Sequence, residues 1–360
     1  MPERGGGRAL VLTHGLFRDV HAKTAHGLVR GPSRWPIAGV VDSSCAGRDA
    51  GEVLDGRNRD VPIFASLTGA LEELSVPPPV CVVGVATEGG VLPADLRAEL
   101  FAAADAGMTL VNGLHQLLED DAELVARVES GGGGIVDVRK PRPASELRFW
   151  SGEVLALTTP RVAVLGTDCA VGKRTTASVL ARELRRRGRR AELIYTGQTG
   201  WMQGQRHGFI LDATPNDFVT GELERVVLAC AAEEESDVIL LEGQSALRNP
   251  SGPCGAELLV SIGTRGVVLQ HGPTREFFLG LEDLGCAIPP LREEIELIRL
   301  LGAEVWAVAL NDEELDAERA EELRARHEEE LGLPVVLPLR GGERVLADAV
   351  LAGLDAGAEG

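Results

Sequence analysis

The sequence predicts an α/β protein with two successive domains, each built around a parallel β-sheet. Its 360 residues are more than one compact core usually holds. Short apolar runs without polar alternation recur between helical patterns, as strands do when helices cover both faces of a sheet. The Gly- and Pro-containing segment 130–154 interrupts this alternation. We therefore place the domain junction near residue 150.

The first domain, residues 1–150, is expected to be Rossmann-like. Strands are predicted at 9–13, 37–41, 80–86 and 108–112, and helices at 23–30, 66–74 and 93–107. The first strand is followed by THGLFRD and not by G-x-G-x-x-G, so NAD is not expected. Lys23, Arg30 and Asp42 lie near strand ends, where they could contact a ligand or the second domain.

The second domain, residues 151–360, starts a new alternation at 161. Strands are predicted at 161–166, 191–195, 237–243, 266–271, 304–310 and 334–338, and helices at 217–235 and 312–331. The helix at 312–331 is charged on most sides, which indicates a solvated outer helix.

Composition narrows the classes of function. The formal net charge of −19 disfavours nucleic-acid binding, although local basic pockets could hold small anions. Six cysteines without a C-x-x-C pair indicate free thiols in a reducing compartment, and no zinc or other metal site is predicted. No signal peptide or long apolar run is evident, so we expect a cytoplasmic protein with a small-molecule substrate and no membrane partner. We also expect a homo-oligomer.

The segment RVAVLGTDCAVGKRTTASVL, residues 161–180, predicts a phosphate-binding loop between a strand and a helix. Backbone N–H groups and the helix dipole would surround an anion there, and Lys173 would add a point charge. The spacing departs from G-x4-G-K-[ST], because five residues separate Gly166 from Gly172 and Arg174 follows the lysine. The motif indicates a phosphorylated ligand and leaves the reaction open. The candidate cofactor-binding residues are Gly166, Thr167, Asp168, Gly172, Lys173, Arg174, Thr175 and Thr176.

GTDCAVGKRTTA resembles the loop of dethiobiotin synthetase-like P-loop proteins, which implies a P-loop NTPase-like second domain. In that family the hydroxyl after the lysine holds magnesium. Arg174 cannot do so, and either Thr175 or Thr176 substitutes for it or magnesium is not needed.

Further segments resemble a two-domain bacterial family, long of unknown function, whose members include D-glutamate N-acetyltransferases. They are KTAHGLVR (23–30), VVDSSCAG (40–47), YTGQTGWM (195–202), LDATPNDFVTGELE (211–224), LLEGQSALRNPSG (240–252) and QHGPTREF (270–277). The resemblance covers nearly the whole chain. It implies transfer of acetyl from acetyl-CoA to an acidic amino acid, D-glutamate first, with a loop that holds the phosphates of coenzyme A. ATP with magnesium, in a kinase or ligase, is the alternative.

Candidate substrate and catalytic residues follow the strands of the second domain, where open α/β sheets place ligands. Asp212, Asp217 and His271 are candidates for the proton acceptor, although Asp212 could only cap a turn and His271 could be structural. Gln198, Thr199, Glu242, Gln244 and Arg275 are candidates for substrate binding. Glu242 could instead be a magnesium-side acid in a kinase-like enzyme, or a partner that supports Lys173. Arg275 could instead begin the next helix. Arg206 and Arg248 are further cations for a substrate carboxylate.

Overall fold

The computed structural model describes residues 7–313 and 315–358. The chain forms two compact units. The first runs to Arg142 and also includes Gly197–Gln205, whereas the second consists of Pro143–Thr196 and the chain from Arg206 onward. The junction predicted near residue 150 lies in the segment after Arg142.

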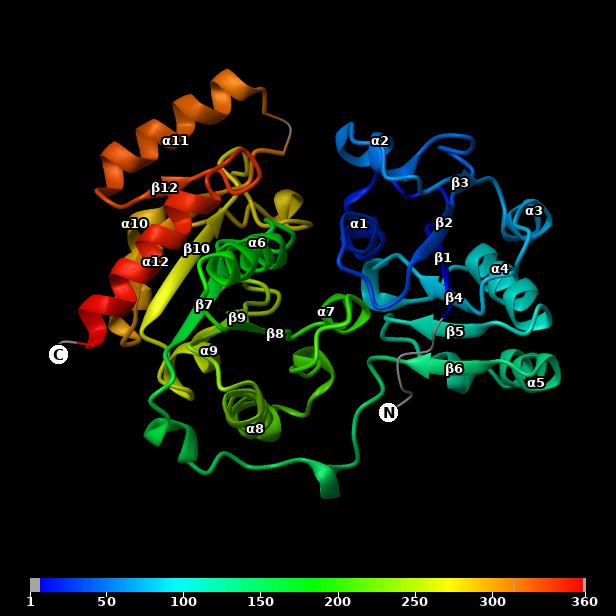
Figure 1. Ribbon diagram of the computed structural model, residues 1–360, viewed down its shortest axis with the longest axis horizontal. Helices are drawn as coiled ribbons and strands as arrows, with labels where there is room; N and C mark the ends of the chain where they lie inside the picture. Colours follow the sequence, from blue (N-terminus) through cyan, green and yellow to red (C-terminus); the bar gives the residue numbers. More distant parts are fainter. Residues whose placement is uncertain (1–6, 314, 359–360) are drawn as a thin grey trace. The chain divides into compact units, whose positions relative to one another are not determined.

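The first unit contains a six-stranded parallel sheet in the order β3-β2-β1-β4-β5-β6, the Rossmann order (Figure 1). Its strands are β1 (Ala9–Leu12), β2 (Ile37–Val41), β3 (Ile63–Phe64), β4 (Val80–Val83), β5 (Thr109–Asn112) and β6 (Gly134–Asp137). Its helices are α1 (Lys23–Arg30), α2 (Ala50–Asp55), α3 (Leu67–Glu73), α4 (Ala94–Asp105), α5 (Ala122–Gly131) and α7 (Gln198–Met202).

The interpretation of 130–154 as an interruption was wrong at its start, because β6 pairs there in parallel with β5. The strand holds only two apolar residues, Ile135 and Val136, after a glycine run, so it gives no apolar stretch to detect. The two-residue strand β3 was missed for the same reason. Both strands lie at the edges of the sheet.

Strand β1 is buried on both faces of the sheet, which explains why its sequence is apolar at every position and does not alternate with polar residues. Leu10 and Leu12 pack in one core cluster with residues of α4, whereas Ala9 and Val11 pack in another with residues of α1. Met202 of α7 is fully buried in that second cluster. The first unit therefore takes part of its core from a segment far along the chain.

The second unit contains a parallel sheet in the order β12-β11-β10-β7-β9-β8. Its strands are β7 (Arg161–Gly166), β8 (Ala191–Ile194), β9 (Val238–Glu242), β10 (Gly266–His271), β11 (Glu304–Leu310) and β12 (Val335–Val336). Its helices are α6 (Lys173–Arg186), α8 (Asn216–Glu234), α9 (Ala256–Val260), α10 (Leu291–Leu300), α11 (Ala317–Leu331) and α12 (Glu343–Ala358). Together the two sheets confirm the predicted α/β class with two parallel sheets.

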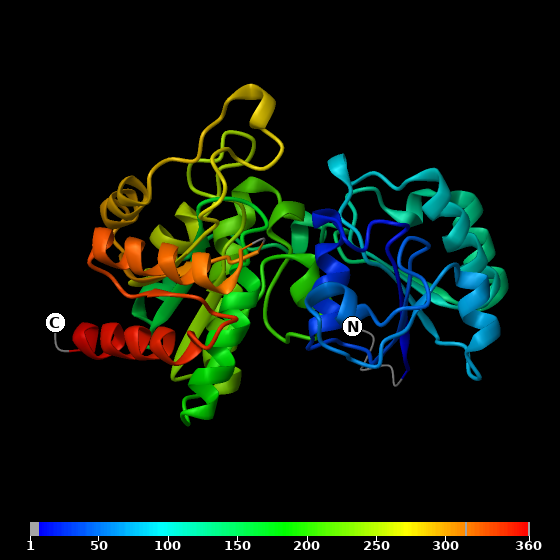
Figure 2. The ribbon, with the colours of Figure 1, turned by 90° about the horizontal axis from the view of Figure 1, so that it is seen from above.

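The helices of the second unit divide between the two faces of its sheet (Figure 2). Residues of α6 and α12 share one core cluster, and residues of α8, α9 and α10 share the other. The connection after β7 thus crosses one face, while those after β9 and β10 cross the opposite face. Neighbouring strands whose connections diverge in this way open a ligand crevice at their carboxyl ends.

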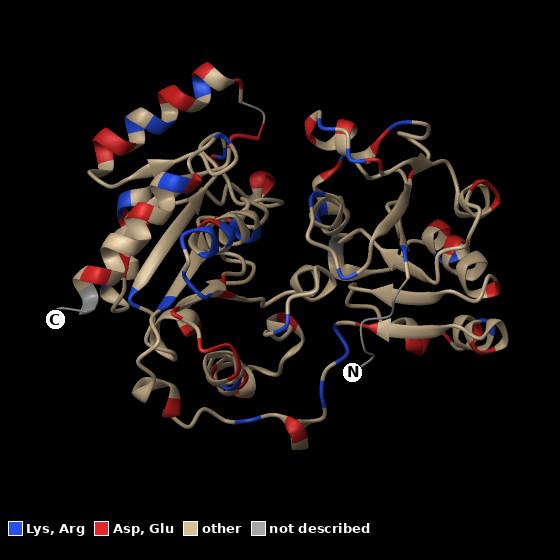
Figure 3. Ribbon diagram, viewed as in Figure 1, with Lys and Arg blue, Asp and Glu red and all other residues tan. Residues whose placement is uncertain are grey.

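Helix α11 is the predicted charged outer helix, and it alternates acidic and basic residues along its length (Figure 3). It buries only Ala320 and Leu323. It begins at Ala317, because the side chain of Asp316 accepts a hydrogen bond from the backbone N–H of Arg319 and caps the first turn. Among the described residues, no helix is both long and apolar enough to span a bilayer.

Candidate phosphate-binding site

The predicted phosphate-binding loop connects β7 directly to the N-terminus of α6. Gly172 adopts a φ of 102° and directly precedes α6, so the first N–H groups of that helix face the loop. A side chain at Gly166 would come within 2.9 Å of Lys173 Cδ. The glycine therefore makes room for the aliphatic part of the lysine.

Lys173 is the central cation of the loop, and it is only 7% exposed. Its ammonium donates to the carbonyl oxygen of Asp168 at 2.7 Å and to that of Ser245 at 2.8 Å. Ser245 lies in the loop after β9 and has a φ of 43°, an uncommon backbone conformation for a residue with a side chain. The lysine thus joins the ends of two adjacent strands.

Asp168 anchors the loop from inside, because its side chain is fully buried. One carboxylate oxygen accepts from the backbone N–H of Cys169 at 2.7 Å. The other accepts from Arg275 Nη1 and from the backbone N–H of Leu279, both at 2.9 Å. Arg275 Nη1 also donates to the carbonyl oxygen of Cys169 at 2.7 Å. Arg275, predicted to bind a substrate carboxylate, therefore forms an ion pair inside the loop cluster.

The end of β10 holds the loop from the other side. The hydroxyl of Thr176 donates to Gln270 Oε1 at 2.5 Å, and both residues are buried. Thr167 Oγ1 lies 2.9 Å from His271 Nδ1. The His271 ring packs edge-on against His327, with ring centroids 5.8 Å apart. Burial, with a smaller contribution from the nearby His327, lowers the pKa of His271 from 6.5 to about 4.

The neutral form of His271 should make the stability of the fold depend on pH. Because its pKa is lower in the folded chain, the unfolded chain binds the proton first as the pH falls from about 6.5 toward about 4. Stability is therefore lost over that window, by at most about 3 kcal/mol for this group. Urea unfolding at pH 7 and pH 5 measures the loss, and His271→Gln should reduce it. An unchanged loss in this variant would contradict the assignment.

The end of β9 contributes an acidic group. Glu242 is 2% exposed, and its Oε1 lies 2.8 Å from Arg174 Nη2. Thr196 Oγ1 donates to the carbonyl oxygen of Glu242 at 2.7 Å and accepts from Gln244 Nε2 at 3.0 Å. The structure therefore brings together the loop, Glu242, Gln244, His271 and Arg275 at the ends of three adjacent strands.

Other predicted residues lie elsewhere in the second unit. Asp212 and Asp217 are exposed, in a short 3-10 turn (Leu211–Ala213) and in the first turn of α8. Both elements follow the edge strand β8. Arg206 pairs with Glu233 and Glu234, and Arg248 pairs with Glu293 and Glu294.

Gln198 and Thr199 are buried in α7, which belongs to the first unit. Gln198 Oε1 accepts from Arg139 Nη2 at 3.0 Å, and the hydroxyls of Thr199 and Thr24 are 3.0 Å apart.

Asp42, at the end of β2, has an internal structural role. Its Oδ2 accepts from Thr13 Oγ1 at 2.7 Å and from the Phe17 N–H at 2.9 Å, while its Oδ1 accepts from the N–H and hydroxyl of Ser44. Burial alone would raise the pKa of Asp42, but these hydrogen bonds lower it. Arg30 pairs with Asp55 at 3.6 Å.

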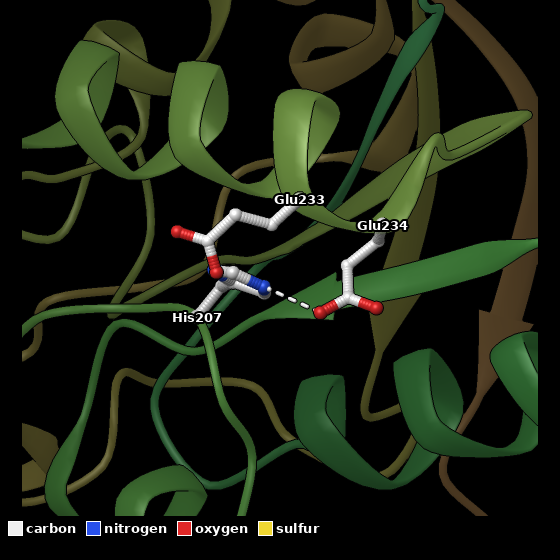
Figure 4. Close-up of side chains that lie close together, drawn as sticks. All are labelled: His207, Glu233 and Glu234. Atoms are coloured by element: carbon white, nitrogen blue, oxygen red, sulfur yellow. Dashed lines mark hydrogen bonds and ion pairs between the residues drawn. The ribbon is translucent and has the colours of Figure 1, made fainter.

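Within the described part of the chain, one group of three side chains could present ligand atoms to a metal ion: His207, Glu233 and Glu234 (Figure 4). His207 Nε2 lies 3.0 Å from Glu234 Oε1. Arg206 already lies 2.7 Å from an oxygen of each carboxylate. The guanidinium of Arg206 therefore already supplies the positive charge that these two carboxylates would attract.

Sequence reasoning missed Ser245 and Gln270, although both lie in segments singled out for the family resemblance. Ser245 contributes a backbone carbonyl, which any residue type could supply, so its side chain gives no signal. Gln270 is a buried polar residue near the end of β10, directly after the apolar run Val267–Leu269. That unusual position was the available signal.

The fold and the site define a P-loop protein with an additional Rossmann-like unit. The chain belongs to the DUF1611 family: the DUF1611 C-terminal P-loop domain matches residues 148–347, and the DUF1611 N-terminal Rossmann-like domain matches residues 43–141. A crystal structure of a DUF1611 family protein from Anabaena variabilis ATCC 29413 is similar, with a TM-score of 0.88, 35% identity, and coverage of 96% of this chain and 100% of that one.

Two curated relatives carry a named activity. A D-glutamate N-acetyltransferase of Tritonibacter scottomollicae is 31% identical over 278 residues, which cover 75% of this chain and 80% of the relative. A D-glutamate N-acetyltransferase of Pseudoalteromonas sp. is 29% identical over 281 residues, which cover 76% and 80%.

Proposed function

We propose that the protein is an N-acetyltransferase that moves acetyl from acetyl-CoA to the amino group of an acidic amino acid, D-glutamate first. The observation that carries this proposal is the loop around Lys173, which keeps a buried cation at a helix N-terminus but has Arg174 where P-loop enzymes have a metal-binding hydroxyl. Such a loop suits a ligand whose phosphates are held and not cleaved. The names of the two curated relatives support the same reaction.

In the proposed reaction, the amino nitrogen loses a proton and attacks the thioester carbonyl carbon. A C–N bond forms, the C–S bond breaks, and the coenzyme leaves as a thiol after taking up a proton. The negative charge that develops on the carbonyl oxygen needs hydrogen-bond donors, which backbone N–H groups of a glycine-rich turn can supply.

We assign the predicted residues the following roles. The loop from Gly166 to Thr176 would hold the phosphates, with Lys173 as its principal charge. His271 is a proton-acceptor candidate that lies beside the loop, and the lowered pKa keeps its ring neutral at neutral pH. Asp212 and Asp217 are the exposed alternatives.

In the second unit, substrate contacts would come from Glu242, Gln244 and Arg275. Gln198 and Thr199 remain candidates within the first unit. Among these, Arg275 is the cation that lies at the loop, and both of its contacts there use Nη1. Glu242 and Gln244 lie at the end of β9. A carboxylate there is suited to accept a hydrogen bond from the amino group of the substrate.

The test follows release of the free coenzyme A thiol with a panel of D- and L-amino acids. We expect D-glutamate to give the fastest release, and Asp212→Asn or Asp217→Asn to lower kcat if that carboxylate takes the proton. If no amino acid releases thiol while ATP is hydrolysed, the kinase or ligase alternative with ATP and magnesium replaces this proposal.

We further propose that the protein acts in the cytoplasm as a homo-oligomer on small molecules alone. The six cysteines are free thiols, which suits a reducing compartment. Sedimentation of the purified chain measures the oligomeric state, and a monomer would contradict the proposal.

A further inference from the structure

The residue after the loop lysine departs from the metal-binding pattern of P-loop enzymes. In those enzymes a Ser or Thr hydroxyl at this position binds magnesium, together with an acidic residue at a strand end. Here Arg174 occupies the hydroxyl position, and the acidic residue at the end of the adjacent strand β9 is Glu242. The two side chains form an ion pair with an N···O distance of 2.8 Å.

These residues do not fit a magnesium ion. Magnesium requires oxygen ligands in near-octahedral geometry at about 2.0–2.1 Å. The hydroxyl is missing, one oxygen of Glu242 contacts a guanidinium, and the positive charge of Arg174 would repel a divalent cation. Thr176 does not replace the hydroxyl, because it is 1% exposed and donates to Gln270. Thr175 is one residue further along α6 and so points about 100° away from Arg174.

We propose that the guanidinium of Arg174, held by Glu242, takes the position and the charge of the magnesium ion, so that the loop binds its phosphorylated ligand without a metal. The proposal depends on the acetyltransferase function only in the choice of coenzyme A as one of two probes. An arginine suits this role because it stays charged at all relevant pH values and its planar fork matches phosphate oxygens.

Two buried atoms support a ligand at this pair. Arg174 Nε and Glu242 Oε2 are both buried and have no hydrogen-bond partner among the described residues. Buried polar atoms are normally paired, so an unsatisfied donor and an unsatisfied acceptor on the two partners of one ion pair call for an explanation. A phosphate oxygen would accept from Arg174 Nε. A donor on the same ligand or on the co-substrate would satisfy Glu242 Oε2.

The experiment measures binding of coenzyme A and of ADP by calorimetry, with EDTA and with excess magnesium chloride. For the wild-type protein we expect dissociation constants that agree within about twofold under the two conditions. Arg174→Thr restores the hydroxyl and releases Glu242, so binding in EDTA should weaken by at least about tenfold and magnesium should recover much of the loss. Arg174→Lys keeps a cation and should stay independent of magnesium.

The matched control is Arg182→Thr, the same substitution at an exposed position of the same helix, which should bind like the wild type. Manganese titrated alone and followed by electron paramagnetic resonance gives a second readout. The wild-type protein should leave it free, whereas Arg174→Thr with ADP should bind it. This readout does not depend on how tightly coenzyme A binds.

The outcomes separate this proposal from the proposed function. If the wild-type protein binds either probe only with magnesium, or binds manganese through Glu242 so that Glu242→Gln abolishes it, the metal-free proposal is overturned. Neither test needs Arg174→Thr, and the first uses only the wild-type protein, so the proposal can be overturned even if that variant fails to fold. If ADP binds without metal and coenzyme A does not bind, the metal-free proposal stands and the acetyltransferase proposal fails.

Discussion

Replacement of Lys173 by alanine is expected to weaken binding of coenzyme A by roughly ten- to a hundredfold, because a charge-assisted hydrogen bond contributes about 1.5–3 kcal/mol. The ammonium is 7% exposed, so solvent screens its charge poorly. Two backbone carbonyl oxygens hold the ammonium in place before a ligand binds. Binding therefore costs little further conformational entropy of the lysine side chain. Calorimetric titration of the folded variant measures the loss.

Lys140→Ala is the matched control, because Lys140 is an exposed lysine in the first unit that pairs with Glu119. Its dissociation constant should equal that of the wild type. The sequence contains only three lysines, so only one other ammonium side chain remains besides the two that are compared. Unchanged affinity in folded Lys173→Ala would remove the loop from the ligand site.

Arg275→Ala is expected to be the most destabilising single change at the site. It leaves the fully buried carboxylate of Asp168 without its cation, and an unpaired buried charge of this kind costs about 2–4 kcal/mol once the partial exposure of Arg275 is taken into account. Calorimetric unfolding measures the change. In an Asp168→Asn background, where no charge is left behind, Arg275→Ala should cost much less.

Arg319→Ala provides the comparison for Arg275→Ala. Arg319 pairs with Glu322 at 2.5 Å on the surface of α11, where both side chains are more than half exposed. Removing such a pair should change the stability by less than about 1 kcal/mol. A loss in Arg275→Ala as small as this would show that Asp168 does not depend on the guanidinium.

The fold was largely predictable because nearly every long strand carries its own signal. A strand such as β7 or β10, buried on both faces, must be apolar at successive positions, and that run is visible in one sequence. Edge strands such as β3 and β6 have too few apolar residues for the pattern to register. Their positions depend on pairing with a neighbour, which local sequence does not encode.

The candidate site was predictable where its residues directly follow a strand or begin a helix that the sequence itself predicts. Lys173, Glu242 and His271 stand at strand or helix ends, and parallel strands bring such ends to one edge. The ion-pair partner of a charged side chain could not be predicted in this way. Nothing in the sequence around Arg275 shows that its Nη1 pairs with Asp168, 107 residues earlier in the chain. The ion pairs of Arg206 with Glu233 and Glu234, and of Arg248 with Glu293 and Glu294, were not predictable for the same reason.

The placement of α7 has a consequence for how such a protein can arise and be divided. Met202 is fully buried in the core of the first unit, yet it is encoded after β7, α6 and β8 of the second. Genetic exchange at a single breakpoint after Arg142 would transfer the Rossmann-like sheet without that side chain and would expose the apolar surface it covers. The two units therefore have separate hydrophobic cores, but the coding sequence of the first cannot be separated from that of the second by one cut. We expect the two units to be inherited together.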